Sequence, residues 1–185
     1  MRDMGKMSDL QVRVAPTSRI KLRKVAMRVR EVLGAKSDEF PSDAFDLLLS
    51  GNFPEYKFDI LPRSIMGRHH GLTEPDQKII FLREDVYEGA MEGNGRDRFT
   101  FAHELGHLLL HSGNYLARYD PAEPKPTHRK FEDSEWQADN FAAELLMPVS
   151  AVKSCADPNE LMEVCEVSYK AAQVRFDVLR SGGFI

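Results

Sequence analysis

Cysteine is scarce in this chain, which has only Cys155 and Cys165 among its 185 residues. The two form neither a CxxC pair nor part of a longer series, so a disulfide-rich secreted scaffold has no support. No apolar run approaches the ~20 residues that a membrane helix needs, and the basic N-terminus lacks the apolar segment of a secretory signal. We therefore expect a protein of the cytoplasm that does not associate with membranes.

An excess of one charge is also missing, because the formal net charge is only −4. Such a balance gives no global attraction to nucleic acid. The first thirty residues differ, since they hold nine lysines or arginines against two acids. A solvated basic helix face and a docking arm for an acidic partner both explain this excess, and the sequence leaves the choice open.

What is present is an ordinary globular composition, with 42% apolar and 29% charged residues. At this length we expect one folded domain with appendages. Hydrophobic spacing, capping residues and turn formers predict its elements. Helices are expected at residues 18–33, 42–49, 94–112 and 134–147, with two short helices after residue 157 that part near residues 167–168; a strand is expected at residues 78–82, with a partner strand near Phe58 and Ile60.

The informative motif is His103-Glu104-Leu105-Gly106-His107, an HExxH sequence inside the helix that Asn94 is expected to cap. Four-residue spacing turns the second imidazole only ~40° past the first, one turn along the helix. Both rings can therefore reach one metal ion. Glu104 projects beside the open side of that ion, where its carboxylate can take a proton from the attacking water.

A catalytic zinc ion usually takes three protein ligands and keeps a fourth position open. An extended HExxHxxGxxH pattern would need glycine at position 110 and histidine at position 113, but the chain has Leu110 and Gly113 there. The other candidate is Glu135 on the next expected helix. Asp139, one turn further on the same face, would accept a hydrogen bond from the far nitrogen of one ligating histidine.

An oxyanion stabiliser should complete such a site. Four residues in or near the proline-containing segment after the motif are candidates, and none is singled out by its spacing: His111, Tyr115, Tyr119 and His128. His111 drifts a further ~40° around the helix, so a role in supporting the ligands or capping the helix is the stronger alternative for it.

Two long segments, residues 98–111 (RFTFAHELGHLLLH) and residues 137–148 (QADNFAAELLMP), resemble the ImmA/IrrE family of zinc metallopeptidases. The resemblance covers roughly residues 78–176. It implies an α+β fold, a minimal, mostly helical gluzincin-like core with a small β-sheet beside the HExxH helix and a C-terminal helical pair. By motif matching it assigns Zn²⁺ to His103, His107 and Glu135, and the catalytic base to Glu104.

The same resemblance implies an endopeptidase that cuts a helix-turn-helix transcriptional repressor. We expect three parts: a flexible basic arm at residues 1–17, a metallopeptidase domain at 18–150, and a C-terminal helical extension at 151–185 that packs on the core. The extension itself resembles a helix-turn-helix. Its mixed charges lack a basic stripe, so direct binding of nucleic acid is not expected.

Two other functions stay open at this point. The chain could be the toxin of a toxin-antitoxin pair that a helix-turn-helix antitoxin neutralises, or a regulatory module that binds DNA or protein. The sequence does not indicate the oligomeric state.

Overall fold

The computed structural model describes residues 13–35, 53–113, 115–117 and 129–185. The helix expected at residues 42–49 lies outside the described residues. The helices are α1 (Arg19–Val32), α3 (Arg63–Met66), α4 (Glu84–Met91), α5 (Gly95–Leu110), α6 (Ser134–Leu146), α7 (Val149–Ser154), α8 (Pro158–Cys165) and α9 (Tyr169–Ser181), with 3₁₀ turns η2 (Pro75–Gln77) and η3 (Lys130–Glu132). The strands are β1 (Arg13–Val14), β2 (Lys57–Leu61), β3 (Gly71–Glu74), β4 (Ile79–Arg83) and β5 (Tyr115–Ala117).

The larger sheet has three strands in the order β2-β4-β3. The central strand β4 is the most hydrophobic and the most buried, as expected for a run of β-branched, aromatic and aliphatic residues. β2 pairs with it in parallel, from Lys57 opposite Ile79 to Leu61 opposite Arg83. β3 pairs with β4 antiparallel. Because β4 is its one neighbour in this order, β3 is an edge strand in the described part of the sheet. The expected strand and its partner near Phe58 are therefore confirmed.

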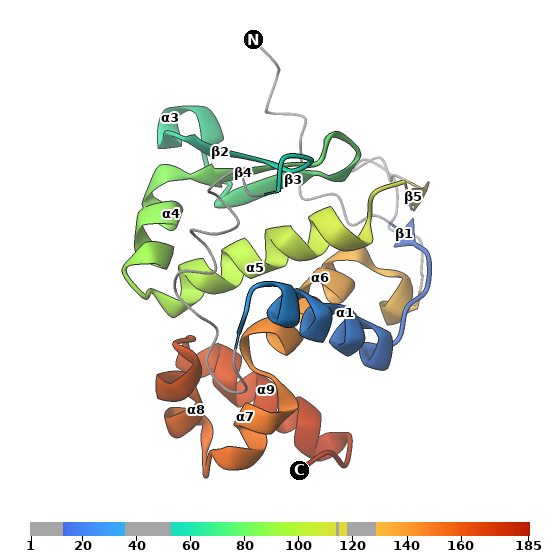
Figure 1. The fold of residues 1–185 in the computed structure, drawn as a ribbon, viewed down its shortest axis with the longest axis vertical. Coiled ribbons are helices and arrows are strands. Elements are labelled where there is room, and N and C mark those ends of the chain that lie inside the picture. The colour runs from blue at the N-terminus through green and yellow to red at the C-terminus, as the bar shows by residue number, and fades with distance from the viewer. Residues whose placement is uncertain (1–12, 36–52, 114, 118–128) are drawn as a thin grey trace.

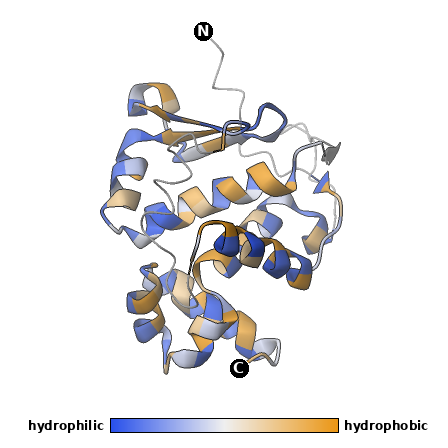
Figure 2. Ribbon diagram, in the orientation of Figure 1, coloured by the Kyte–Doolittle hydropathy of each residue, from blue (hydrophilic) through white to orange (hydrophobic). Residues whose placement is uncertain are grey.

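Helix α5 lies under this sheet and crosses the middle of the molecule (Figure 1). The side chain of Asn94 accepts hydrogen bonds from the backbone amides of Arg96 and Asp97, which confirms the expected N-cap. The first turn of α5 is polar and its later turns are mostly apolar (Figure 2). The apolar turns reach both the sheet and the helices on the other side, so α5 is the central layer of the fold.

Helices α6 and α1 form the layer on the other side of α5 (Figure 1). Both were expected, and their caps, Asp133 and Ser18, accept hydrogen bonds from the first turn of each helix. A Cβ added at Gly106 of α5 would lie 3.1 Å from the Cα of Ala138 in α6. Small residues on both helices thus allow the close approach that places the HExxH motif against α6.

The C-terminal helices α7, α8 and α9 gather at the end of the molecule away from the sheet (Figure 1). Asp157 caps α8 and Ser168 caps α9, in agreement with the expected pair of helices. The turn between them lies against the start of α5, since a Cβ added at Gly95 would lie 2.3 Å from the backbone of Val167. Arg175 of α9 is buried and paired with Glu144 of α6.

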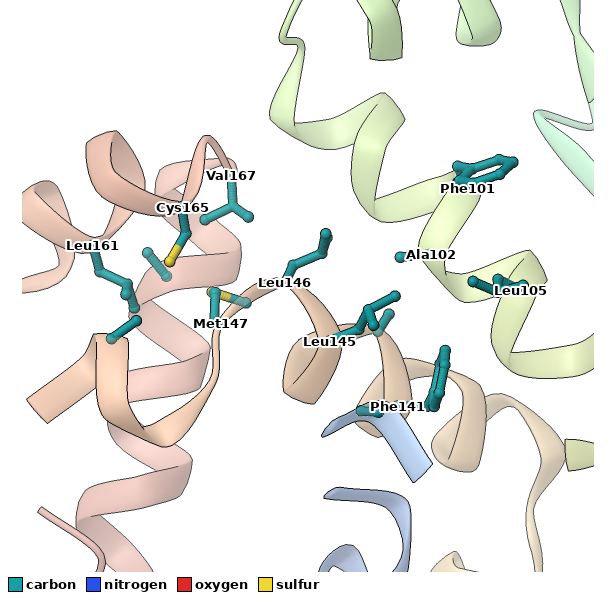
Figure 3. Packing of buried hydrophobic residues seen from close by; sticks show 14 of the residues in the cluster. Phe101, Ala102, Leu105, Phe141, Leu145, Leu146, Met147, Leu161, Cys165 and Val167 are labelled. Atoms are coloured by element: carbon teal, nitrogen blue, oxygen red, sulfur yellow. The ribbon is translucent and has the colours of Figure 1, made fainter. Parts of the chain in front are cut away.

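One continuous hydrophobic cluster joins these layers, with side chains of α5, α6, α8 and the α8–α9 turn facing one another (Figure 3). It includes residues of both the expected domain at 18–150 and the expected extension at 151–185. The fold is α+β and mostly helical, as expected. Among the described residues, no helix combines the length and the apolar character that crossing a membrane requires.

The N-terminal segment differs from the expected arm in residues 13–17. Strand β1 pairs antiparallel with β5, and Val14 is only 1% exposed. The amide of Thr17 donates a hydrogen bond to the carbonyl of Phe131 at 3.0 Å. These residues lie against the body of the protein because Val14 is apolar and their backbone groups find partners there, while residues 1–12 lie outside the described residues.

Candidate metal centre and catalytic site

Three side chains from α5 and α6 converge on one point. The Nε2 atoms of His103 and His107 lie 2.9 Å apart, and they lie 3.2 and 3.3 Å from the two carboxylate oxygens of Glu135. In the part of the chain that the structure describes, these residues are the one group of histidines, cysteines and acids arranged to hold a metal ion. The structure thus brings together the three ligands that the sequence analysis named.

The arrangement follows from local structure. Helix α5 places the two histidines one turn apart on the face that meets α6, with Gly106 between them at the close contact. Glu135 lies in the first turn of α6, two residues after the Asp133 cap, so the start of that helix places the carboxylate beside the imidazoles. The convergence depends on two rigid helices rather than on loops.

The geometry and the donor set fit a zinc ion. Zinc bonds of ~2.0–2.1 Å in a tetrahedron separate neighbouring ligand atoms by about 3.3 Å. The three separations between the Nε2 atoms and the carboxylate oxygens are close to that value. Two imidazoles and one carboxylate are ligands that suit zinc and related transition metals rather than calcium or magnesium.

The electrostatics of this cluster favour a cation. Burial lowers the pKa of His103, but hydrogen bonds to Asp139 and Glu135 outweigh it and raise the pKa to about 10. Burial likewise raises the pKa of Glu135, but the facing imidazoles of His103 and His107 hold that pKa well below its usual range. Among the described residues, no lysine or arginine pairs with Glu135. A site that draws a proton onto an imidazole in this way also attracts a metal ion.

Asp139 lies where the sequence analysis expected it. Its carboxylate oxygen is 2.9 Å from Nδ1 of His103, so Nδ1 donates and Nε2 faces the point of convergence. The side chain of Asp139 is largely exposed, in contrast to the buried surroundings of the imidazoles. Asp139 therefore orients His103 from the solvent side.

Glu104 is buried beside the sheet. The hydroxyl of Thr73 in β3 donates to Oε2 of Glu104 at 2.6 Å, and Glu104 is close enough to His103 to raise the pKa of that ring. A Cβ added at Gly71 would lie 2.6 Å from Cγ of Glu104, so only glycine leaves room for the carboxylate there. The contacts of Gly71 and Thr73 had no signal in the sequence, because they come from the turn-rich segment that precedes β4.

The four candidates for oxyanion stabilisation are not all described by the structure. Tyr119 and His128 lie outside the described residues, and Tyr115 belongs to β5, of which the structure describes the backbone. His111 is fully buried, with its ring nitrogens engaged by His107 and Gln137. A ring enclosed in this way does not reach a substrate, so the interpretation of His111 as an oxyanion stabiliser is corrected; the residue is the C-cap of α5 and contacts His107.

The pKa of His111 agrees with that role. Burial, and next the neighbouring His107, lower its pKa to about 4, so the ring is neutral at physiological pH. A neutral ring can accept a hydrogen bond at one nitrogen while it donates from the other. His111 thus links the metal centre to the interior of α6.

Comparison with known families matches residues 63–177 to the model described as the IrrE N-terminal-like domain, a peptidase family. This match spans more than half of the chain. The chain belongs to this family. The resemblance found in the sequence is thereby confirmed, and the IrrE-like match begins earlier than that resemblance, so that it takes in α3 and β3 with Gly71 and Thr73. No curated protein matches the chain.

Proposed function

We propose that this member of the IrrE N-terminal-like family is a zinc-dependent endopeptidase that hydrolyses a peptide bond in a protein substrate. The observation that carries the proposal is the convergence of His103, His107 and Glu135, whose ligand atoms all lie within 4.8 Å of one another. The membership in a peptidase family supports it independently.

His103, His107 and Glu135 would hold the ion, and a fourth position would stay open for water or substrate. When bound, the ion acidifies a water molecule and polarises the scissile carbonyl. The protein supplies the alignment. Asp139 keeps Nε2 of His103 turned toward the centre, and the helix contact at Gly106 keeps α5 and α6 at the distance that the three ligands need.

Glu104 would act as the general base and then as the general acid. It takes the proton of the attacking water and returns it to the leaving amine. Thr73 holds one carboxylate oxygen of Glu104 by a hydrogen bond, which leaves the other oxygen to receive the proton. Since Glu104 follows His103 directly in α5, its carboxylate stays beside the metal centre throughout the reaction.

Strand β3 offers a place for the substrate. In the described part of the sheet it is an edge strand, and two of its residues, Gly71 and Thr73, contact Glu104. An extended peptide that pairs with β3 would pass the catalytic carboxylate, because peptides bind sheet edges through main-chain hydrogen bonds. This mode suits an endopeptidase, which must bind a chain on both sides of the cut.

The substrate class that we propose is a helix-turn-helix transcriptional repressor, and the support for it is the family resemblance. We expect the reaction to take place in the cytoplasm. The two cysteines are buried and are not joined in a disulfide, which is compatible with a reducing compartment.

The test is a cleavage assay with a helix-turn-helix protein encoded beside this chain, followed by mass spectrometry of the products. We expect Glu104→Gln to lower cleavage by about 10²–10⁴-fold, the usual contribution of a general acid-base residue, while zinc content is unchanged. Glu88→Gln is the matched control, because Glu88 is an exposed glutamate of α4. Cleavage that survives in Glu104→Gln would refute the proposal, and growth arrest on expression would favour the toxin alternative for the same peptidase.

A further inference from the structure

Two buried polar side chains beside the metal centre have no part in the mechanism above. His111 lies one turn after His107 in α5, and Gln137 lies two residues after Glu135 in α6. Nδ1 of His107 is 3.0 Å from Nδ1 of His111, and Nε2 of His111 is 3.3 Å from Oε1 of Gln137. Gln137 is 3% exposed. Buried polar groups of this kind are retained where each finds a hydrogen-bond partner.

The amide of Gln137 ends this series on the backbone. Its Nε2 donates to the carbonyl of Ala15 at 2.9 Å and to the carbonyl of Phe131 at 2.8 Å. A backbone carbonyl can only accept, so these two contacts use both amide hydrogens and settle which end of the amide faces His111. The oxygen of Gln137 therefore points at His111.

That orientation fixes one hydrogen of His111. The oxygen of Gln137 accepts, so Nε2 of His111 must carry the hydrogen. Nδ1 of His111 and Nδ1 of His107 are 3.0 Å apart, so one of the two nitrogens carries the hydrogen that lies between them. When His107 carries that hydrogen, the lone pair of its Nε2 points at His103 and Glu135. That tautomer is the one that can bind a metal ion.

We propose that His111 and Gln137 are positioning residues which, with the carbonyls of Ala15 and Phe131, hold His107 in its metal-binding tautomer. This inference rests on the proposed function, because it concerns the same metal centre. It also includes the N-terminal segment in the site, since Ala15 belongs to residues 13–17. The two histidine ligands are thus supported in different ways, His103 by an exposed carboxylate and His107 by a buried relay.

The N-terminal segment is held where the relay needs it. Val14 is buried, and Arg13 pairs with Glu132 at 3.1 Å. The carbonyl of Phe131 in η3 accepts hydrogen bonds from the amide of Thr17 and from the side chain of Gln137. This one carbonyl therefore connects both the N-terminal segment and the relay to η3. Undocking of residues 13–17 would remove the Ala15 acceptor and leave the Phe131 acceptor. Its effect on His107 should therefore be smaller than that of losing His111.

The experiment uses the full chain and two measurements. Ring ¹⁵N chemical shifts of the metal-free protein report which nitrogen of His107 carries the hydrogen, and competition with a chelator reports the zinc affinity. We expect His107 to be protonated on Nδ1. In His111→Leu we expect this preference to be lost and zinc affinity to fall by about 10–100-fold, as for other residues that support metal ligands.

Two further variants separate positioning from packing. His111→Asn keeps an acceptor near the position of Nδ1, and we expect it to keep zinc affinity within a few-fold of the unchanged chain. Leu108→Ala, a buried change on the same helix outside the relay, should lower thermal stability and leave the tautomer and zinc affinity intact. Val14→Ala should loosen the N-terminal segment and lower zinc affinity by less than His111→Leu does.

The outcomes are decisive in each direction. A His107 ring protonated on Nε2 in the unchanged chain, or unchanged zinc affinity in a folded His111→Leu, overturns the relay. Equal losses in Leu108→Ala and His111→Leu also overturn it, in favour of a packing role. If His111→Leu does not fold, the tautomer of His107 in the unchanged chain decides. Failure of the unchanged chain to bind zinc counts against the proposed function, and the tautomer measurement in the metal-free protein still tests the relay.

Discussion

Two glutamates of α6 have opposite surroundings. Glu135 and Glu144 are nine residues apart, which places them on opposite faces of the helix. Glu144 is 2% exposed and accepts four hydrogen bonds, two from the guanidinium of Arg23 and two from that of Arg175, at 2.7–3.1 Å. Glu135 has a side chain that is 37% exposed and faces two imidazoles.

The pKa of each carboxyl group does not distinguish the two roles. Burial raises the pKa of Glu144, but hydrogen bonds from Arg175 and Arg23 outweigh it and lower the pKa, as the histidines do for Glu135. The partners do distinguish them. Glu144 has permanent cations that belong to α1 and α9, so its ion pairs join three helices. Glu135 has partners that can release their protons, so its charge is available for a metal ion.

The largest effect on folding should come from Glu144→Gln. This change leaves the buried guanidinium of Arg175 without its charge partner, and breaking a buried pair costs about 3–5 kcal/mol. We expect the free energy of unfolding to fall by that amount in a urea titration of the metal-free protein. Zinc affinity, measured on the folded variant, should stay within a few-fold. A stability equal to that of the unchanged chain would show that the network is not a structural one.

Glu135→Gln should give the reverse pattern. It removes one of the three proposed metal ligands. Loss of a residue that only supports a ligand typically lowers affinity by about 10–100-fold, and we expect a larger fall in zinc affinity here. The metal-free variant should lose less stability than Glu144→Gln in the same urea titration, because no lysine or arginine of the described residues depends on this carboxylate. If zinc binds Glu135→Gln and the unchanged chain equally well, the third ligand is a different residue.

The smallest expected effect is the dependence of stability on acid. The pKa of Glu144 is lower in the folded protein than the value of 4.5 for a free side chain. Its contribution is therefore fully present above pH 4.5 and is lost as the pH falls through the lower pKa of the folded state. Glu135 behaves in the same way in the metal-free protein. Urea titrations between neutral and acidic pH should show a shallower decline in each glutamine variant than in the unchanged chain.

Most of the candidate site could be predicted from the sequence, because its parts are local. The spacing of His103 and His107 follows from one helical turn, and Glu135 and Asp139 are likewise one turn apart after a capping residue. Several elements were missed for equally physical reasons. Helix α4 is short and has only Val86 and Ala90 as fully buried residues, and β3 contains a glycine and lies in a segment rich in turn formers.

The sequence by itself determined the longer helices α1, α5, α6 and α9 and the order of the ligands along α5 and α6, because hydrogen bonds within three or four residues depend on local residue types. Only the tertiary structure decided which distant groups meet. Thr73 reaches Glu104 across 31 residues, Gln137 reaches Ala15 across 122, and Arg23 reaches Glu144 across 121. Such contacts require the packing of α1, α5, α6 and the sheet around one core, and no local pattern encodes the partner of a side chain so far along the chain.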